Sequence, residues 1–132
     1  MTKTQFNKTY FLLLLYKLNN TEVCLKSTTK YIALFDDYEL IVDGIEYVHS
    51  VSSVHHQLLL YYLCVELFKI FKKQKENKQN EREEQFVELI SDFVYRTFGK
   101  TKETADKLNV CPKEYEKLEN VFARKNLVSK YN

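Results

Sequence analysis

Residues 38–50, YELIVDGIEYVHS, decide the fold that the sequence predicts. Asp43-Gly44 lies between two apolar runs, and this dipeptide is the two-residue turn that fits the right-handed twist of a β-hairpin. A two-residue loop sets the register, so Val42 would pair with Ile45 and the apolar residues would share one face of the ribbon. The stretch therefore predicts a hairpin whose apolar face needs a covering helix.

A first helix and two more strands are predicted before the hairpin. Residues 4–18 carry apolar side chains at helical spacing, and although FLLLL at 11–15 also fits a buried strand, we expect a helix. TEVCLKS at 21–27 and TKYIALFD at 29–36 are short runs with β-branched or aromatic members, and the Ser-Thr-Thr where they meet supplies turn chemistry. These segments predict a small antiparallel meander that ends in the hairpin.

The second half of the chain is expected to be helical. A helix over 53–76 begins with a part that is apolar nearly all round, as expected for a central helix packed on several sides. A helix over 81–98 has acids in its first turn and an apolar stripe, with Gly99 as its C-terminal cap. The predicted fold class is therefore α+β and mostly helical: an N-terminal helix, a small antiparallel β-meander with a hairpin, and about four helices.

Size and composition predict one domain over residues 1–132, because a chain of this length with 45% apolar residues buries most of its apolar surface. A polar run at 77–80 marks a possible subdivision into 1–76 and 81–132. The three cysteines are odd in number and widely separated, which favours a reducing cytoplasm over a disulfide framework. The most apolar stretch, 58–71, contains charged residues and is short for a membrane span, so we expect no membrane partner.

Residues 101–122, TKETADKLNVCPKEYEKLENVF, carry the most specific motif. A short helix is predicted up to Leu108, followed by Asn109 in the left-handed conformation and a second helix from Pro112, whose missing N–H is harmless at a first helical position. With small Ala105 where the two helices would cross, this stretch resembles the helix-turn-helix of small phage-type DNA-binding regulators. The rest of the chain resembles no family.

The resemblance implies that the second helix is a recognition helix that enters a groove. Its outward positions would be Lys113, Glu116, Lys117 and Asn120. The stretch departs from the family where Asn109 stands in place of the usual Gly and Cys111 in place of a capping Ser. Three glutamates on the second helix, Glu114, Glu116 and Glu119, nearly cancel its basic residues. A helical hairpin that only packs is the alternative.

Two groups of basic side chains are candidates for nucleic-acid binding, although the net charge of +2 is small. The first is a lysine stripe, of which the first three members share one helical face: Lys69, Lys72, Lys73, Lys75 and Lys78. The second group is Lys113, Lys117, Arg124 and Lys125. If both groups face one side of the molecule, they form a single surface for phosphate. The alternative for each is a solvated helix end.

Catalytic, cofactor and metal signatures are missing from the sequence. His55 and His56 are adjacent and cannot share one helical face, which makes them a poor metal template. Cys64 falls in the apolar helix, and Cys111 has no identifiable basic partner in the sequence. Two isolated glycines cannot form a phosphate loop. We therefore expect a protein that is not an enzyme and uses no cofactor.

The function expected from these observations is a small accessory or regulatory protein that binds DNA or RNA. In length and composition, a short chain rich in Lys, Asn and Tyr is similar to accessory proteins of bacteriophages and mobile elements, including inhibitors of host defence complexes such as CRISPR systems. The alternative is a protein-interaction inhibitor that binds and blocks a host protein or ribonucleoprotein complex through exposed tyrosines and acid-rich surfaces. A homodimer is compatible with either function.

Overall fold

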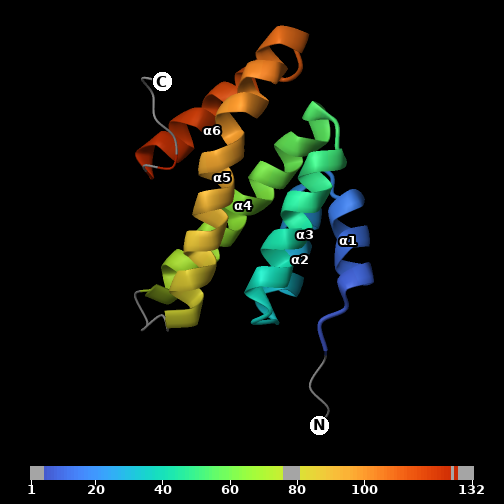
Figure 1. Ribbon diagram of the computed structural model, residues 1–132, viewed down its shortest axis with the longest axis vertical. Helices are drawn as coiled ribbons and strands as arrows, with labels where there is room; N and C mark the ends of the chain where they lie inside the picture. Colours follow the sequence, from blue (N-terminus) through green and yellow to red (C-terminus); the bar gives the residue numbers. More distant parts are fainter. Residues whose placement is uncertain (1–4, 76–80, 126, 128–132) are drawn as a thin grey trace.

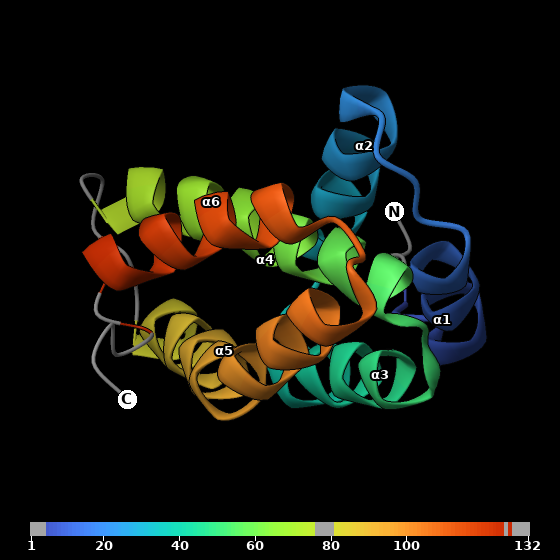
Figure 2. The same ribbon diagram turned by 90° about the horizontal axis from the view of Figure 1, so that it is seen from above.

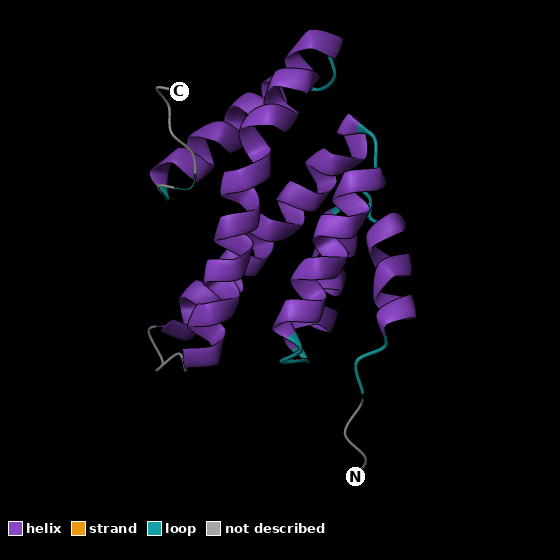
Figure 3. Ribbon diagram, in the orientation of Figure 1, coloured by secondary structure: helices purple, strands orange, loops and turns teal. Residues whose placement is uncertain are grey.

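The computed structural model describes residues 5–75, 81–125 and 127, and all regular elements in these ranges are helices (Figures 1 and 3). They are α1 (Lys8–Tyr16), α2 (Glu22–Ala33), α3 (Tyr38–Val51), α4 (Val54–Lys75), α5 (Glu81–Leu108) and α6 (Pro112–Arg124). The predicted α+β class is therefore wrong, because the described part of the chain contains no strand. Buried residues from all of these helices form one hydrophobic cluster. The predicted subdivision at 77–80 lies outside the described residues.

The predicted hairpin over 38–50 is wrong because these residues form α3. The buried side of α3 consists of Ile41, Val42, Gly44, Ile45, Val48 and His49. This spacing of three and four residues is that of one helical face. Gly44 makes no turn: a β-carbon at this position would lie 2.7 Å from Cε2 of Phe11 in α1. The glycine is needed because α1 and α3 approach closely at this point. Because it follows an aspartate, the dipeptide has the sequence of a hairpin turn although it forms none.

The two predicted strands over 21–27 and 29–36 are also wrong, since α2 runs through most of both. Thr21 begins the helix by accepting a hydrogen bond from the backbone N–H of Cys24 at 3.2 Å. The Ser-Thr-Thr predicted as a turn lies inside the helix, where the hydroxyl of Thr29 donates to the carbonyl of Leu25 at 2.6 Å. Thr28, Thr29 and Ile32 are buried and α2 packs against α4, so tertiary packing overrides the weak β preference of these residues.

The preference for a helix near the N-terminus is confirmed, and the predicted central helix is confirmed almost to its ends. α1 begins after Asn7, whose side-chain oxygen accepts from the N–H of Tyr10 at 2.9 Å. α4 packs against α2, α3, α5 and α6 (Figure 2). Its leucines from Leu58 to Leu60 are at most 6% exposed. Within the described ranges, no helix is both long enough and apolar enough to cross a membrane.

α5 is a single long helix, so the predicted end at Gly99 is wrong. The buried positions of α5 continue past Gly99 at helical spacing, through Phe98 and Thr101 to Ala105. Gly99 itself is exposed, and a β-carbon there would meet no atom within 4 Å. The apolar stripe, which packs against α4 and α6, keeps the backbone helical although glycine is a poor helix former. The first helix of the predicted helix-turn-helix is therefore the last part of α5.

The left-handed conformation predicted for Asn109, in the turn between α5 and α6, is confirmed. Cys111, for which none was predicted, is also left-handed, with a φ of 48°. Asn109 has a φ of 54°, and the N–H groups of Asn109 and Val110 bond to the carbonyls of Asp106 and Ala105 at 3.2 and 2.9 Å. This pair of bonds is a Schellman motif, which satisfies the last carbonyls of a helix. α6 begins at Pro112, as predicted, and turns back across α5 (Figure 1).

A buried polar cluster joins α3, α4 and α5. Nε2 of His49 lies 2.9 Å from the hydroxyl oxygen of Tyr61. That oxygen also lies 2.8 Å from Oγ1 of Thr97 and 3.1 Å from Oγ1 of Thr101. Burial lowers the pKa of His49 to about 4 and raises the pKa of Tyr61 to about 12, so both side chains are uncharged near pH 7. Tyr61 is fully buried and belongs to the core.

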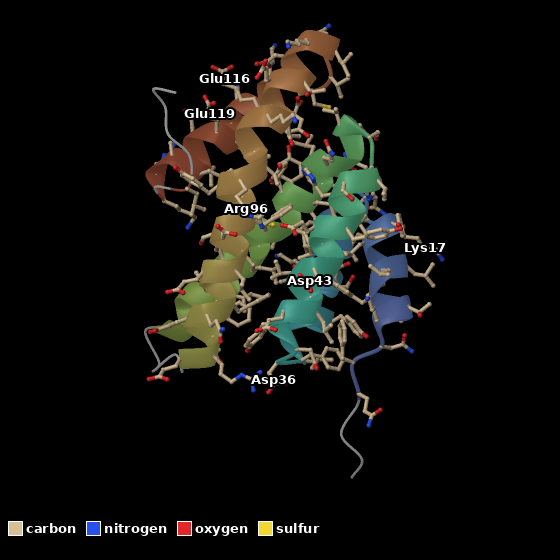
Figure 4. The ribbon with its side chains drawn as sticks, in the orientation of Figure 1. Lys17, Asp36, Asp43, Arg96, Glu116 and Glu119 are labelled. Atoms are coloured by element: carbon tan, nitrogen blue, oxygen red, sulfur yellow. The ribbon has the colours of Figure 1, made fainter. Side chains whose placement is uncertain are left out.

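Two arginines of α5 form ion pairs with Glu46 of α3 and with Asp36, which lies just before α3. Arg96, which is labelled in Figure 4, pairs with Glu46 of α3 and, through Nε at 2.7 Å, with Asp92 of its own helix. Arg82 lies 3.5 Å from a carboxylate oxygen of Asp36, just before α3. These pairs are largely exposed, and such pairs contribute about 0–1 kcal/mol each. They help to set the orientation of α5, while the apolar contacts supply most of the stability.

Candidate nucleic-acid interface

α6 buries one face and exposes the opposite one. Its buried side chains, at most 3% exposed, are Tyr115, Leu118 and Phe122. Lys113, Lys117 and Arg124 are exposed and, being spaced by four and seven residues, lie together on the other face. They follow the helix for about 16 Å. We call these three residues the α6 ridge. The outward placement predicted for Lys113 and Lys117 is confirmed.

The three glutamates of α6 flank this ridge. A hydrogen bond to Asp106 is the main cause that raises the pKa of Lys102 in α5, and the charges of Glu119 and Glu116 add to it. Glu116 and Glu119 therefore lie near Lys102 of α5. Figure 4 shows that the two glutamates project from one side of α6. Burial, followed by the charge of Glu114, raises the pKa of Tyr62, which places Glu114 on the α4 side.

The balanced charge of α6 along the sequence is thus separated in space. Acids lie toward α5 and α4, and basic groups lie on the outer ridge. Among the described residues, none of the ion pairs includes Lys113, Lys117 or Arg124. Cations that no neighbouring acid holds can contact phosphate without breaking an internal pair. The two lysines act as point charges, and the arginine adds a planar fork that matches phosphate oxygens.

The lysine stripe of α4 is only partly described. Lys69 is exposed, and its Nζ lies 3.3 Å from Oε1 of Glu66. The charge of Lys69 also contributes, after Lys26, to the lowered pKa of Glu22 in α2, so Lys69 is engaged with acids on the α2 side. Lys69 is therefore not part of the α6 ridge. The helix backbone continues through Lys72, Lys73 and Lys75, whose side chains lie outside the described residues, as does Lys78.

Lys125 connects the end of α6 with α4. Its Nζ lies 5.7 Å from the ring centroid of Phe68, a cation–π distance. Phe68 directly precedes Lys69, so α6 ends beside the part of α4 where the lysine stripe begins. The structure therefore brings Lys125 close to the start of the stripe, while Lys113 and Lys117 lie near the other end of α6.

Two relationships near α6 had no signal in the sequence. Lys102 and the acids of α6 meet only because α6 turns back across α5. Sγ of Cys111 lies 3.5 Å from Nδ1 of His55, a residue 56 positions away at the start of α4. The sequence identified no basic partner for this thiol, and no local spacing could have done so, because the pair exists only in the folded chain.

A metal site is not formed by the described residues, in which no group of three or more His, Cys, Asp or Glu side chains could hold an ion. Comparison of the chain with family models, with curated proteins and with solved structures finds no match. The properties of the residues themselves are therefore the basis for any functional proposal.

Proposed function

We propose that this protein binds DNA or RNA through the α6 ridge and acts as a small accessory or regulatory protein. The observation that carries the proposal is the line of Lys113, Lys117 and Arg124, exposed opposite the buried face of α6 and outside the ion pairs of the described residues. Contacts of this kind go to the phosphate backbone and position the protein without reading sequence. With a net charge of only +2, binding depends on this local group and is sensitive to salt.

The turn before α6 supports a helix-turn-helix mode of binding. The Schellman motif at Asn109 and the start of α6 at Pro112 fix where the exposed face of α6 points. In this mode Lys113 and Lys117, in the first two turns of α6, contact phosphates at the edge of the groove, and Arg124 contacts the backbone further along. A helical hairpin that only packs would bury the same side of α6. The two possibilities therefore differ only in whether the α6 ridge binds nucleic acid.

Fluorescence anisotropy with labelled DNA duplex and labelled single-stranded RNA, measured over a series of salt concentrations, tests the proposal. The triple variant Lys113→Ala, Lys117→Ala, Arg124→Ala is expected to bind at least about tenfold more weakly. For duplex DNA, the slope of log K against log salt should flatten by about 0.9 for each phosphate contact that is lost.

The matched control is the triple variant Lys8→Ala, Lys17→Ala, Lys30→Ala, which removes the same charge from exposed positions in and beside α1 and α2. Lys17 projects from the side of the molecule opposite α6 (Figure 4). This control should keep the affinity and the salt slope of the original chain. An equal loss in both variants, or a chain that binds neither probe at low salt, would refute the assignment of the ridge.

Exposed tyrosines favour a second candidate function, an inhibitor that binds and blocks a host complex such as a CRISPR-type effector. Tyr16 of α1 and Tyr47 of α3 are 46% and 55% exposed, and desolvation and the neighbouring Tyr47 hydroxyl raise the pKa of Tyr16. Such amphipathic rings are typical of protein interfaces. In pull-downs from nuclease-treated host extract, retention of a complex that Tyr16→Ala, Tyr47→Ala abolishes and the ridge variant preserves would favour this function.

A further inference from the structure

The start of α4 and the start of α6 meet, and the meeting point holds a thiol and an imidazole. Sγ of Cys111, the residue before α6, lies 3.5 Å from Nδ1 of His55 in the first turn of α4. The hydroxyl of Tyr115 donates to the carbonyl of Val54 at 2.6 Å and holds the two helix starts together. The partial positive charge of a helix N-terminus favours a thiolate, and an imidazole at hydrogen-bond distance can accept its proton.

The other two cysteines lack this arrangement and serve as internal references. Cys64 is fully buried in α4, and burial raises its pKa to about 12, which keeps it protonated. Cys24 is half-buried, like Cys111, and lies in the first turn of α2. Within the described residues, no imidazole contacts Cys24. Cys24 therefore controls for exposure and for position at a helix start, and differs from Cys111 in the imidazole.

His55 also belongs to the wall of a cavity of about 730 Å³ between the α3–α4 turn and the second half of α5. The wall carries the hydroxyls of Ser50, Ser53 and Thr104 and the cationic groups of Arg96 and Lys100. Arg96 is held by Glu46 and Asp92, whereas Lys100 takes part in none of the ion pairs of the described residues. Val110, the residue before Cys111, also lines the cavity, whereas Cys111 itself does not, so the thiol lies beside the cavity next to His55. A small molecule with carboxylate groups fits a cavity whose wall carries hydroxyl groups and one available cation.

We propose that Cys111 is a site of thiol–disulfide exchange for a small disulfide that carries carboxylates and enters this cavity. His55, in its neutral form with its hydrogen on Nε2, accepts the thiol proton at Nδ1. The Cys111 thiolate attacks one sulfur of the disulfide, and the S–S bond breaks. The electron pair leaves on the second sulfur, which departs as a thiolate and takes up a proton. Cys111 is oxidised to a mixed disulfide and the departing thiol is reduced.

The test treats the reduced full chain with glutathione disulfide and follows adduct formation at each cysteine by peptide mass spectrometry. Cys111 is expected to react about tenfold faster than Cys24, because Nδ1 of His55 lies within hydrogen-bond distance of its thiol and can take up the proton. His55→Gln, at an exposed position, should slow the reaction of Cys111 by a similar factor and leave Cys24 unchanged. Cys24→Ser is the matched control and should not alter the rate at Cys111. A Cys24 that reacts as fast as Cys111, or a His55→Gln variant with the original rate, overturns the proposal.

The cavity is tested separately from the thiol. Lys100→Glu should slow the reaction with glutathione disulfide but not with uncharged hydroxyethyl disulfide. If both reagents are slowed equally, or neither is slowed, the cavity does not select anionic disulfides and that part of the proposal is wrong. The ratio of the rates at Cys111 and Cys24 in the unaltered chain needs no variant, so the assignment of the thiol remains falsifiable if a substitution prevents folding.

Discussion

A β-carbon on Gly44 would lie 2.7 Å from Cε2 of Phe11, so the backbone of α3 meets the ring of Phe11 with no space for a methyl group. Phe11 is fully buried and cannot turn away into solvent. Gly44→Ala is therefore expected to lower the free energy of unfolding by about 1–3 kcal/mol, because the overpacked helices must separate. The gain in helix propensity, about 1 kcal/mol, only partly offsets this loss. Urea denaturation provides the measurement, and an unchanged midpoint would show that α1 and α3 adjust freely.

Gly99→Ala should have the opposite effect. Gly99 lies inside α5, and a β-carbon there meets no atom within 4 Å. Alanine limits the unfolded chain more than glycine does and is the best helix former, so the free energy of unfolding should rise by about 1 kcal/mol. The same urea titration measures it, with Gly44→Ala as the counterpart. A loss of stability would mean that α5 does not continue through Gly99.

Asn109 should respond to substitution as a left-handed helix end. Its φ of 54° suits glycine best and is costly for a side chain branched at Cβ. We expect Asn109→Gly to raise the free energy of unfolding by up to about 1 kcal/mol and Asn109→Val to lower it by about 1–2 kcal/mol. Thermal unfolding followed by circular dichroism would detect both changes, and equal stability of the two variants would argue against the Schellman motif.

His49 makes the stability of the fold depend on pH. Burial lowers its pKa from 6.5 to about 4, so the unfolded chain binds a proton at a higher pH than the folded chain. The contribution of His49 to the free energy of unfolding is complete above pH 6.5, decreases as the pH falls, and is lost near pH 4. Its size is on the order of 2–3 kcal/mol. Urea denaturation between pH 4 and 7.5 measures it. His49→Gln keeps a donor without a titrating group and should show a flatter profile, while a parallel profile would assign the effect to other groups.

The parts of the fold that the sequence predicted correctly are those with local causes. Asn109 and Pro112 mark a helix end and a helix start by their own backbone preferences. The central helix was predicted from a long segment that is apolar nearly all round, as expected for a helix packed on several sides. In each case the determining residues lie within a few positions of the feature, so no knowledge of distant contacts was needed.

The errors arise where distant contacts decide the structure. Asp43-Gly44 matches a hairpin turn locally, but Phe11, more than thirty positions earlier, explains why glycine is there. α2 contains Thr, Val and Ile, which favour strands, yet its packing on α4 makes it helical. At the candidate interface, spacing alone predicted the exposed face of Lys113 and Lys117. The placement of acids beside Lys102, and of His55 beside Cys111, required the folded chain.

The polar cluster of His49, Tyr61, Thr97 and Thr101 can also be described by counting its protons. The hydroxyl of Thr101 donates to the carbonyl of Thr97 at 2.9 Å and accepts the hydroxyl hydrogen of Tyr61 at 3.1 Å. The single phenolic hydrogen therefore goes to a threonine, and the contact of Tyr61 with His49 is satisfied only if Nε2 carries the hydrogen. His49 is thus the Nε2–H tautomer. Each hydrogen bond of this chain is donated in the same direction, from His49 of α3 to Tyr61 of α4 and from Tyr61 to Thr101 of α5. The three helices are therefore joined by one chain of hydrogen bonds with a fixed donor direction.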